Sequence, residues 1–163
     1  TGKVVWQWAA TYSVYAVAVD SQGNAYAGDG AGMVTKIDST GKKAWAWQSN
    51  NSVYGVAADG QGNVYAADGD DTNGKGNVTK LSSTGKVVWQ WAATNALHCI
   101  ALDSAGNAYA GGNDKYITKL SKDKKVMWQM PMSENVVSLS FDIKYDLYAA
   151  RLHAAFKFKN TVS

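Results

Sequence analysis

Residues 2–40 read GKVVWQWAATYSVYAVAVDSQGNAYAGDGAGMVTKIDST and contain four short apolar runs. The runs cover residues 3–8, 14–19, 25–27 and 33–37, and they are separated by stretches rich in glycine, asparagine and serine. In the first run Val4, Trp6 and Trp8 occupy alternate positions, which places them on one face of an extended strand. Short strands with frequent turns of this kind are typical of an all-β sandwich, barrel or propeller.

The same pattern recurs along the rest of the chain. The repeat units span residues 2–40, 41–84, 85–123 and 124–163, and the fourth unit is the most divergent. Equivalent aspartates mark the units at Asp20, Asp59, Asp103 and Asp142. The additional residues of the second unit fall in one loop, 68–77, and stacked repeats tolerate such length changes in loops. A period of roughly 40 residues with four strands per unit predicts a β-propeller.

The predicted fold is therefore all-β: one domain over residues 1–163 that forms a propeller of four four-stranded blades. The strand at 14–19 and its equivalents carry mainly small side chains, which suit the crowded axis, so the tryptophan-bearing strand is expected to be outermost. We expect residues 3–8 to pair with the last blade and close the ring, because this pairing removes an open sheet edge. The alternative is a fragment of a larger ring of about six to eight blades.

Composition narrows the class of protein further. The 163 residues are 46% hydrophobic and 18% charged, which favours a packed domain over a disordered chain. The net charge of +3 is small and dispersed, so no nucleic-acid partner is expected. The single cysteine excludes a disulfide framework. No apolar run approaches the roughly 18 residues of a membrane span.

Two parts of the repeat resemble known propeller families. The tryptophan-docking repeat of quinoprotein-type (PQQ-like) propellers is similar to Asn24-Ala-Tyr-Ala-Gly-Asp29 followed by Val34-Thr-Lys-Ile-Asp-Ser-Thr-Gly-Lys-Lys-Ala-Trp45, a pattern that recurs at 63–89 and 107–128. The NHL-type repeat is similar to Val17-Ala-Val-Asp-Ser-Gln-Gly-Asn-Ala-Tyr26, which recurs at 56–65 and 100–109. In the fourth unit Lys144-Tyr145-Asp146 replaces the Gly-Asn turn.

The resemblance implies a propeller fold and leaves the function open, because propellers host many activities. In the tryptophan-docking family the tryptophan packs between neighbouring blades, a structural role that the resemblance transfers to Trp6, Trp45, Trp89 and Trp128. Quinoprotein dehydrogenases hold their cofactor in a much longer chain with more blades. We therefore expect no cofactor here.

A second tryptophan in each outer strand forms the first candidate binding feature. Trp8, Trp47 and Trp91 recur where the outer strand leads into the next blade, and Met130 replaces them in the fourth unit. This end of the strands is expected to form the upper rim of the propeller. The tryptophans are interpreted either as a platform for sugar rings or as packing beneath the connecting loops, since tryptophan mainly contributes buried area.

The start of the inner strand carries the second candidate feature. Tyr15, Tyr54 and His98 occupy equivalent positions, with Val137 in the fourth unit, and they are expected to converge at the mouth of the central channel. Convergent polar groups predict either a ligand site or a hydrogen-bonded plug. His98 and its neighbour Cys99 are expected to point to opposite faces of the strand, which argues against a joint role.

Three other patterns are interpreted as structural. Asp68, Asp70 and Thr72 have the spacing of a calcium loop but lack its glutamate, so no metal is expected. The recurring aspartates are expected to accept hydrogen bonds from the turns that follow them. A recurring mid-strand lysine is expected to face solvent and limit aggregation. It occurs at Lys36, Lys80 and Lys119.

These observations predict a non-enzymatic binding or structural module, extracellular or part of a virion, whose upper rim contacts a glycan or protein partner. A homo-oligomer is left open. The candidate contact residues are Trp8, Tyr12, Tyr15, Trp47, Asn51, Tyr54, Trp91 and His98. One alternative is a small propeller enzyme, a lyase or hydrolase centred on His98 at the channel mouth. The other is part of a larger propeller whose remaining blades carry the function.

Overall fold

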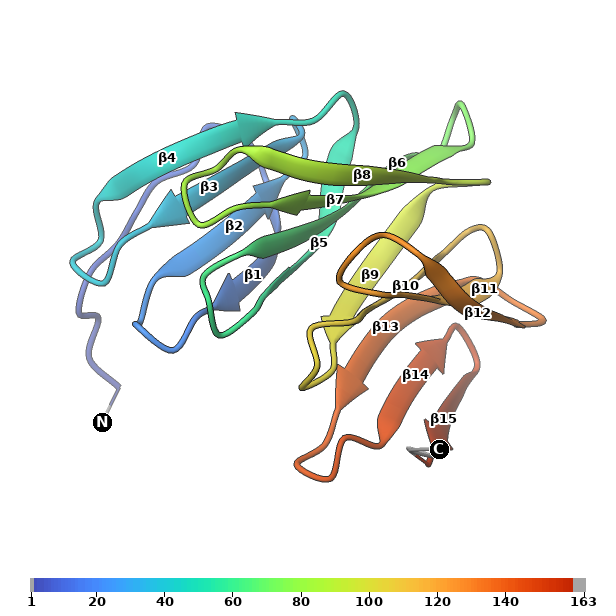
Figure 1. Ribbon diagram of the computed structural model, residues 1–163. Helices are drawn as coiled ribbons and strands as arrows, with labels where there is room; N and C mark the ends of the chain where they lie inside the picture. The colour runs from blue at the N-terminus through green and yellow to red at the C-terminus, as the bar shows by residue number, and fades with distance from the viewer. Residues whose placement is uncertain (1, 160–163) are drawn as a thin grey trace.

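The computed structural model describes residues 2–159 and forms four antiparallel sheets in chain order (Figure 1). The first sheet contains β1 (Val14–Val19), β2 (Ala25–Asp29), β3 (Met33–Ile37) and β4 (Lys43–Gln48). The second contains β5 (Ser52–Ala58), β6 (Val64–Asp70), β7 (Lys75–Leu81) and β8 (Val87–Ala93). The third contains β9 (Leu97–Leu102), β10 (Ala108–Gly112), β11 (Tyr116–Leu120) and β12 (Val126–Pro131). The fourth contains β13 (Val136–Phe141), β14 (Leu147–Arg151) and β15 (Ala154–Phe158).

The prediction of an all-β chain of repeated sheets is confirmed, and we call the sheets blades one to four. The first strands of the blades pack on one another in sequence, β1 on β5, β5 on β9 and β9 on β13. Small residues are required at these contacts. A Cβ atom built on Gly55 of β5 would lie only 3.1 Å from the backbone nitrogen of Ile100 in β9. None of the described residues forms a helix long and apolar enough to cross a membrane.

The predicted pairing of residues 3–8 with the last blade is not formed in the structure. Described residues 2–12 contain no strand, and β15 pairs with β14 alone among residues 2–159. The four blades follow an arc, and the segment before β1 and the last strand, β15, lie on opposite sides of its opening (Figure 1). The N-terminal segment lies instead on blade one, where Trp8 packs against Ala25, Ala27 and Ile37.

The turn after each first strand forms as the aspartate pattern predicts. Asp20 Oδ1 accepts hydrogen bonds from the backbone nitrogens of Gln22 and Asn24, at 2.9 and 3.0 Å. The equivalent carboxylates of the other three blades accept the same pair of bonds, so this expectation is confirmed. Each carboxylate replaces backbone partners that the tight turn leaves unpaired.

The recurring lysines differ from the expectation of a solvent-facing charge. They are half-buried, and each ammonium lies over the ring of the tyrosine that pairs with it on the neighbouring strand. The Nζ-to-centroid distances are 5.4 Å for Lys36 over Tyr26, 5.0 Å for Lys80 over Tyr65 and 4.9 Å for Lys119 over Tyr109. Since each ring attracts the cation through its π face, these lysines contribute to blade packing.

Tryptophans connect successive blades at their outer strands. Trp45 Nε1 in β4 donates a hydrogen bond to the carbonyl of Ser83 in blade two, at 2.9 Å. Trp89 Nε1 in β8 makes the equivalent bond to the carbonyl of Lys122 in blade three, also at 2.9 Å. The rings of Trp6 and Trp45 cover Gly41 and Gly85 respectively, where a Cβ atom would approach each tryptophan side chain to 2.8 Å.

Candidate functional site

One end of the array collects the links between blades and the hairpins that join the second and third strands of each blade. We call this end the connection face; it contains residues 30–32, 49–52, 70–74, 94–96 and 112–115. Backbone hydrogen bonds tie these loops together. Ser49 N donates to Gly32 O at 2.8 Å, and Asn113 N donates to Ala96 O at 2.8 Å. The loops therefore provide a fixed support for side chains at the starts of the inner strands.

Three rings from consecutive inner strands form a continuous stack on this face. Tyr15 and Tyr54 have ring centroids 5.3 Å apart with planes inclined by 14°. Tyr54 and His98 have centroids 4.8 Å apart with planes inclined by 2°. The rings come from equivalent positions of β1, β5 and β9, so the side-by-side packing of these strands produces the stack. Tyr15 remains half exposed at one end of it.

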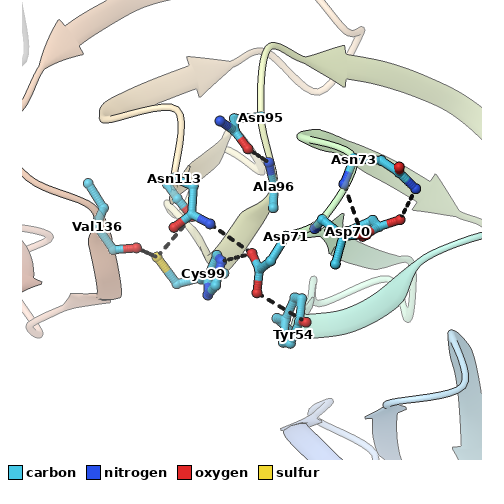
Figure 2. A network of polar contacts seen from close by, with 12 residues as sticks. Tyr54, Asp70, Asp71, Asn73, Asn95, Ala96, Cys99, Asn113 and Val136 are labelled. Carbon is cyan, nitrogen blue, oxygen red and sulfur yellow. Dashed lines mark hydrogen bonds and ion pairs between the residues drawn. The ribbon is translucent and has the colours of Figure 1, made fainter.

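A carboxylate from the hairpin between β6 and β7, Asp71, contacts the other end of this stack (Figure 2). Asp71 Oδ1 lies 3.0 Å from Nε2 of His98 and accepts a 2.7 Å hydrogen bond from Nδ2 of Asn113. Asp71 Oδ2 accepts a longer bond, 3.5 Å, from the hydroxyl of Tyr54. One exposed carboxylate thus connects two blades. Tyr54 and Asp71 belong to the second blade, and His98 and Asn113 belong to the third.

The hairpin that carries Asp71 is shaped by its two neighbouring aspartates. Asp70 Oδ1 accepts hydrogen bonds from the backbone nitrogen and the hydroxyl of Thr72, which fixes the turn. Asp68 is fully buried and accepts bonds from Ser49 Oγ at 2.6 Å and from Asn51 Nδ2 at 3.0 Å. These contacts direct Asp68 inward and Asp70 along the turn. Among residues 2–159, no group of three or more histidine, cysteine, aspartate or glutamate side chains is placed to hold a metal ion.

Burial raises the pKa of two side chains in this region, Tyr54 and Cys99. Burial, reinforced by the charge of Asp71, raises the pKa of Tyr54, so its phenol stays protonated and can donate. Burial also raises the pKa of Cys99 to about 12. The Cys99 sulfur lies 3.4 Å from the carbonyl oxygen of Gly111, away from the Asp71 contacts. The expectation that His98 and Cys99 point to different surroundings is confirmed.

Two hollows lie on the connection face, and one of them borders the stack at Tyr54. The nearer one has a volume of about 420 Å³ and is lined by Asn51, Ser52, Tyr54, Asp71 and Thr72, among others. The second, of about 750 Å³, lies across the link at Asn50 and Asn51 and is lined by Trp47, Asn73 and Gln90. Asn51 borders both hollows. Most groups around the smaller hollow are hydrogen-bond donors or acceptors.

The structure brings together some of the residues expected at the upper rim and separates others. Tyr15, Tyr54 and His98 share the stack, and Asn51 and Trp47 border the hollows next to it. Trp47 and Trp91 are half-buried and pack against the apolar clusters between blades. Two further residues line a separate hollow of about 270 Å³ on blade one. These are Trp8 and Tyr12.

Sequence reasoning missed Asp71 and Asn113 as parts of this site. Asp71 lies in the one loop whose length differs between units, and that difference was the available signal. The calcium-like spacing of this loop involves Asp68, Asp70 and Thr72, whereas the side chain that contacts the stack is Asp71. Asn113 carries no pattern in the sequence that distinguishes it from other loop asparagines.

Comparison with known proteins identifies the fold and no family. No family model matches the sequence, and no curated protein matches it. The structure superposes on the computationally designed Ika4 protein with a TM-score of 0.79 and 14% identity, covering 98% of this chain and all of that one. It superposes on the WD40 β-propeller domain of Doa1 with a TM-score of 0.78 and 15% identity, covering 91% and 51%.

BamB from Moraxella catarrhalis gives a TM-score of 0.72 at 22% identity, with 90% of this chain and 46% of that chain covered. The chain therefore spans about half the length of the Doa1 and BamB chains. At these identities the likeness establishes a β-propeller architecture, with three four-stranded sheets and one three-stranded sheet.

Proposed function

We propose that the protein is a non-enzymatic binding module that takes a glycan on its connection face. The observation that carries this proposal is the stack of Tyr15, Tyr54 and His98, held by Asp71 at the edge of a polar hollow. Ligand sites commonly combine an aromatic wall with a few fixed polar groups in a concave surface. Here Tyr54 supplies the aromatic part of the wall, and the hairpin at residues 70–74 supplies polar groups.

The chemistry around the hollow suits a polyhydroxylated ligand. Asp71 accepts hydrogen bonds, the side-chain amide of Asn51 can both donate and accept, and the hydroxyl of Ser52 can do the same. Both faces of the Tyr54 ring are covered by its neighbours in the stack, so its edge adds apolar contact area and its hydroxyl adds a polar group at the hollow. Asp71 is held by its contacts to His98 and Asn113 before any ligand binds, so little ordering of this carboxylate would accompany binding.

A glycan array followed by titration of the best binder tests the proposal. We expect Asp71→Ala to weaken binding about tenfold or more, because hydrogen bonds to a charged group contribute about 1.5–3 kcal/mol. Asp123→Ala is the matched control, since Asp123 is an exposed aspartate in a turn between the third and fourth strands of blade three, away from the connection face. Equal losses in both variants, or no binding on the array, would refute the glycan proposal. A protein partner would then be the remaining binding class.

A second candidate function is catalysis at the same place. The imidazole of His98 lies against the carboxylate of Asp71, which is the arrangement of a general base with its orienting group. If the protein is a lyase or hydrolase, the bound glycan should be cleaved, and His98→Ala should abolish the cleavage while binding persists. A glycan that is bound and never cleaved would exclude this candidate.

A further inference from the structure

The first blade exposes positions that every other blade buries. Val17 of β1 is 65% exposed, whereas its equivalents in the other three inner strands are each 8% exposed. Those equivalents are Val56, Ile100 and Leu139. Val14 shows the same contrast, because it is exposed while its equivalents Val53, Leu97 and Val136 are fully buried. In blades two to four the preceding blade covers these positions. Blade one therefore exposes an apolar face of the kind that packs against a neighbouring blade elsewhere in the structure.

The last blade exposes the opposite face in the same way. Tyr148 of β14 is 39% exposed, whereas Tyr26, Tyr65 and Tyr109 at the equivalent position are 0%, 0% and 5% exposed. The outer edge of β15 is also unpaired among residues 2–159, although the third strand of every other blade pairs with a fourth. An unpaired strand edge offers a row of backbone donors and acceptors to another strand.

The sequence contains a strand that fits this edge. Residues 1–11 and residues 84–94 both read TGKVVWQWAAT. In the second copy of this sequence, residues 87–93 form β8, the fourth strand of blade two. In the first copy, described residues 2–11 form no strand. The same amino acids therefore pair where a third strand lies beside them and remain unpaired where none does.

The unpaired segment already lies where the fourth strand of a preceding blade would lie. Trp6 covers Gly41 of blade one as Trp45 of blade one covers Gly85 of blade two. Trp8 packs on the apolar cluster of Ala25, Ala27 and Ile37. Its equivalent Trp91 packs on the cluster that contains the corresponding residues of the next blade. Those residues are Ala108, Ala110 and Leu120.

We infer that two copies of this chain form a closed ring of eight blades, in which residues 3–8 of each copy complete the last blade of the other. Pairing within one chain would require blade four to reach the N-terminal segment, and these lie on opposite sides of the opening of the arc (Figure 1). The chain covers about half the length of the Doa1 and BamB chains and all of the designed Ika4 chain, so the comparisons leave the number of blades in the ring to the experiment.

The repeat fixes the register of the proposed junction. In blade two Thr79 pairs with Gln90 and Lys80 with Trp89. The equivalent pairs across the junction are Phe156 with Gln7 and Lys157 with Trp6. Trp128 also gains a partner in this arrangement. Trp128 is 37% exposed and borders a hollow of about 570 Å³. Gly2 is the equivalent of Gly85, which the Trp45 ring covers in blade two. In the proposed ring, Gly2 of the second copy would lie under Trp128 in the same way.

Sedimentation of the chain and of two valine variants tests the inference. We expect a mass of about 35 kDa, twice the 17.4 kDa of one chain. Val17→Glu should give a folded particle of one-chain mass, because the substitution places a charge in the proposed junction. Val87→Glu is the matched control, since Val87 is 52% exposed on β8 and lies outside the junction. A wild-type mass of 17.4 kDa at every soluble concentration would overturn the inference.

Cysteine pairs test the register independently of the mass. Gln7→Cys combined with Phe156→Cys should form a disulfide between chains, because directly opposed residues of antiparallel strands lie within disulfide reach. The matched pair Thr79→Cys and Gln90→Cys should form a disulfide within one chain and leave the mass unchanged. A Gln7–Phe156 disulfide within one chain would establish a closed four-blade ring and overturn the proposal. A two-chain particle without this disulfide would also overturn it.

Discussion

The contact between Trp45 and blade two provides a direct test of how the blades are held together. Trp45 is half-buried, its ring covers Gly85, and its centroid lies 6.0 Å from that of Tyr26. A buried area of about 150 Å² for such a ring, at about 25 cal/mol per Å², corresponds to about 4 kcal/mol. The hydrogen bond from Nε1 to the Ser83 carbonyl adds about 1 kcal/mol. We therefore expect Trp45→Ala to lower the free energy of unfolding by about 3–5 kcal/mol.

Urea unfolding followed by far-ultraviolet circular dichroism measures this loss. The measurement is best made in the Val17→Glu background, because association makes the apparent stability depend on protein concentration. Trp45→Phe should lose about 1–2 kcal/mol, since it keeps a ring over Gly85 and loses the donor to Ser83. In the same background Trp6→Ala should lose less than Trp45→Ala, because the segment that carries Trp6 pairs with no strand in the described part of the chain, whereas Trp45 lies on β4. A loss below about 1 kcal/mol for Trp45→Ala would refute the docking argument.

Two further predictions concern buried titratable groups. Asp103 is partly buried, which opposes ionisation, but its hydrogen bonds from Asn107 and its ion pair with Lys119 outweigh this effect and lower the pKa of its carboxyl below the ordinary 3.8. The ionised carboxylate therefore stabilises the folded state above pH 3.8, and this stabilisation is lost as the pH falls through the lowered pKa. Asp103→Asn should cost about 1–2 kcal/mol of unfolding free energy at neutral pH. The unfolding free energy of this variant should also depend less on pH in the acid range. The thiol of Cys99, whose pKa burial raises to about 12, should resist a thiol reagent at neutral pH until urea unfolds the chain; rapid labelling of the native protein would contradict its burial.

The repeated strands could be predicted from the sequence because each blade carries its own local signals. The alternation of small apolar residues defines β1, β5, β9 and β13, and the aspartate-led turns end each of them. The tyrosine–lysine contacts were accessible as well, because Tyr26 and Lys36 are directly paired on β2 and β3. These contacts depend on the register between the second and third strands, which a single strand does not reveal.

The N-terminal segment shows what local sequence does not determine. Residues 87–93 form a strand because β7 lies beside them, while the identical residues 4–10 lack such a neighbour within the arc. A strand is stabilised by the strand that pairs with it. When the pairing strand lies far along the chain or in another chain, the sequence of the segment does not identify it. The alternation in residues 3–8 correctly indicates a strand-forming sequence, and it cannot indicate which chain provides the pairing edge.

The candidate site was predictable in its aromatic part and hidden in its polar part. Equivalent positions on adjacent inner strands necessarily lie side by side, which brings Tyr15, Tyr54 and His98 together. The direction of Asp71 depends on how Asp70 closes the hairpin through Thr72, a contact that operates over a few residues of an irregular loop. Because Asp70 makes the hydrogen bonds that close the turn, the Asp71 side chain can point toward His98 and Tyr54.

The two proposals can be separated because the polar part of the site, unlike Tyr15 on β1, lies away from the junction. Asn51, Tyr54, Asp71 and His98 all belong to one chain and lie in blades two and three, whereas the junction involves blades one and four. The affinity of a monovalent glycan should therefore be the same for the Val17→Glu variant as for the wild-type protein, with one glycan per chain in both. In the proposed ring, Val137 of a second copy would lie next to Tyr15. A loss of glycan affinity in the Val17→Glu variant would mean that this second copy contributes to the binding surface.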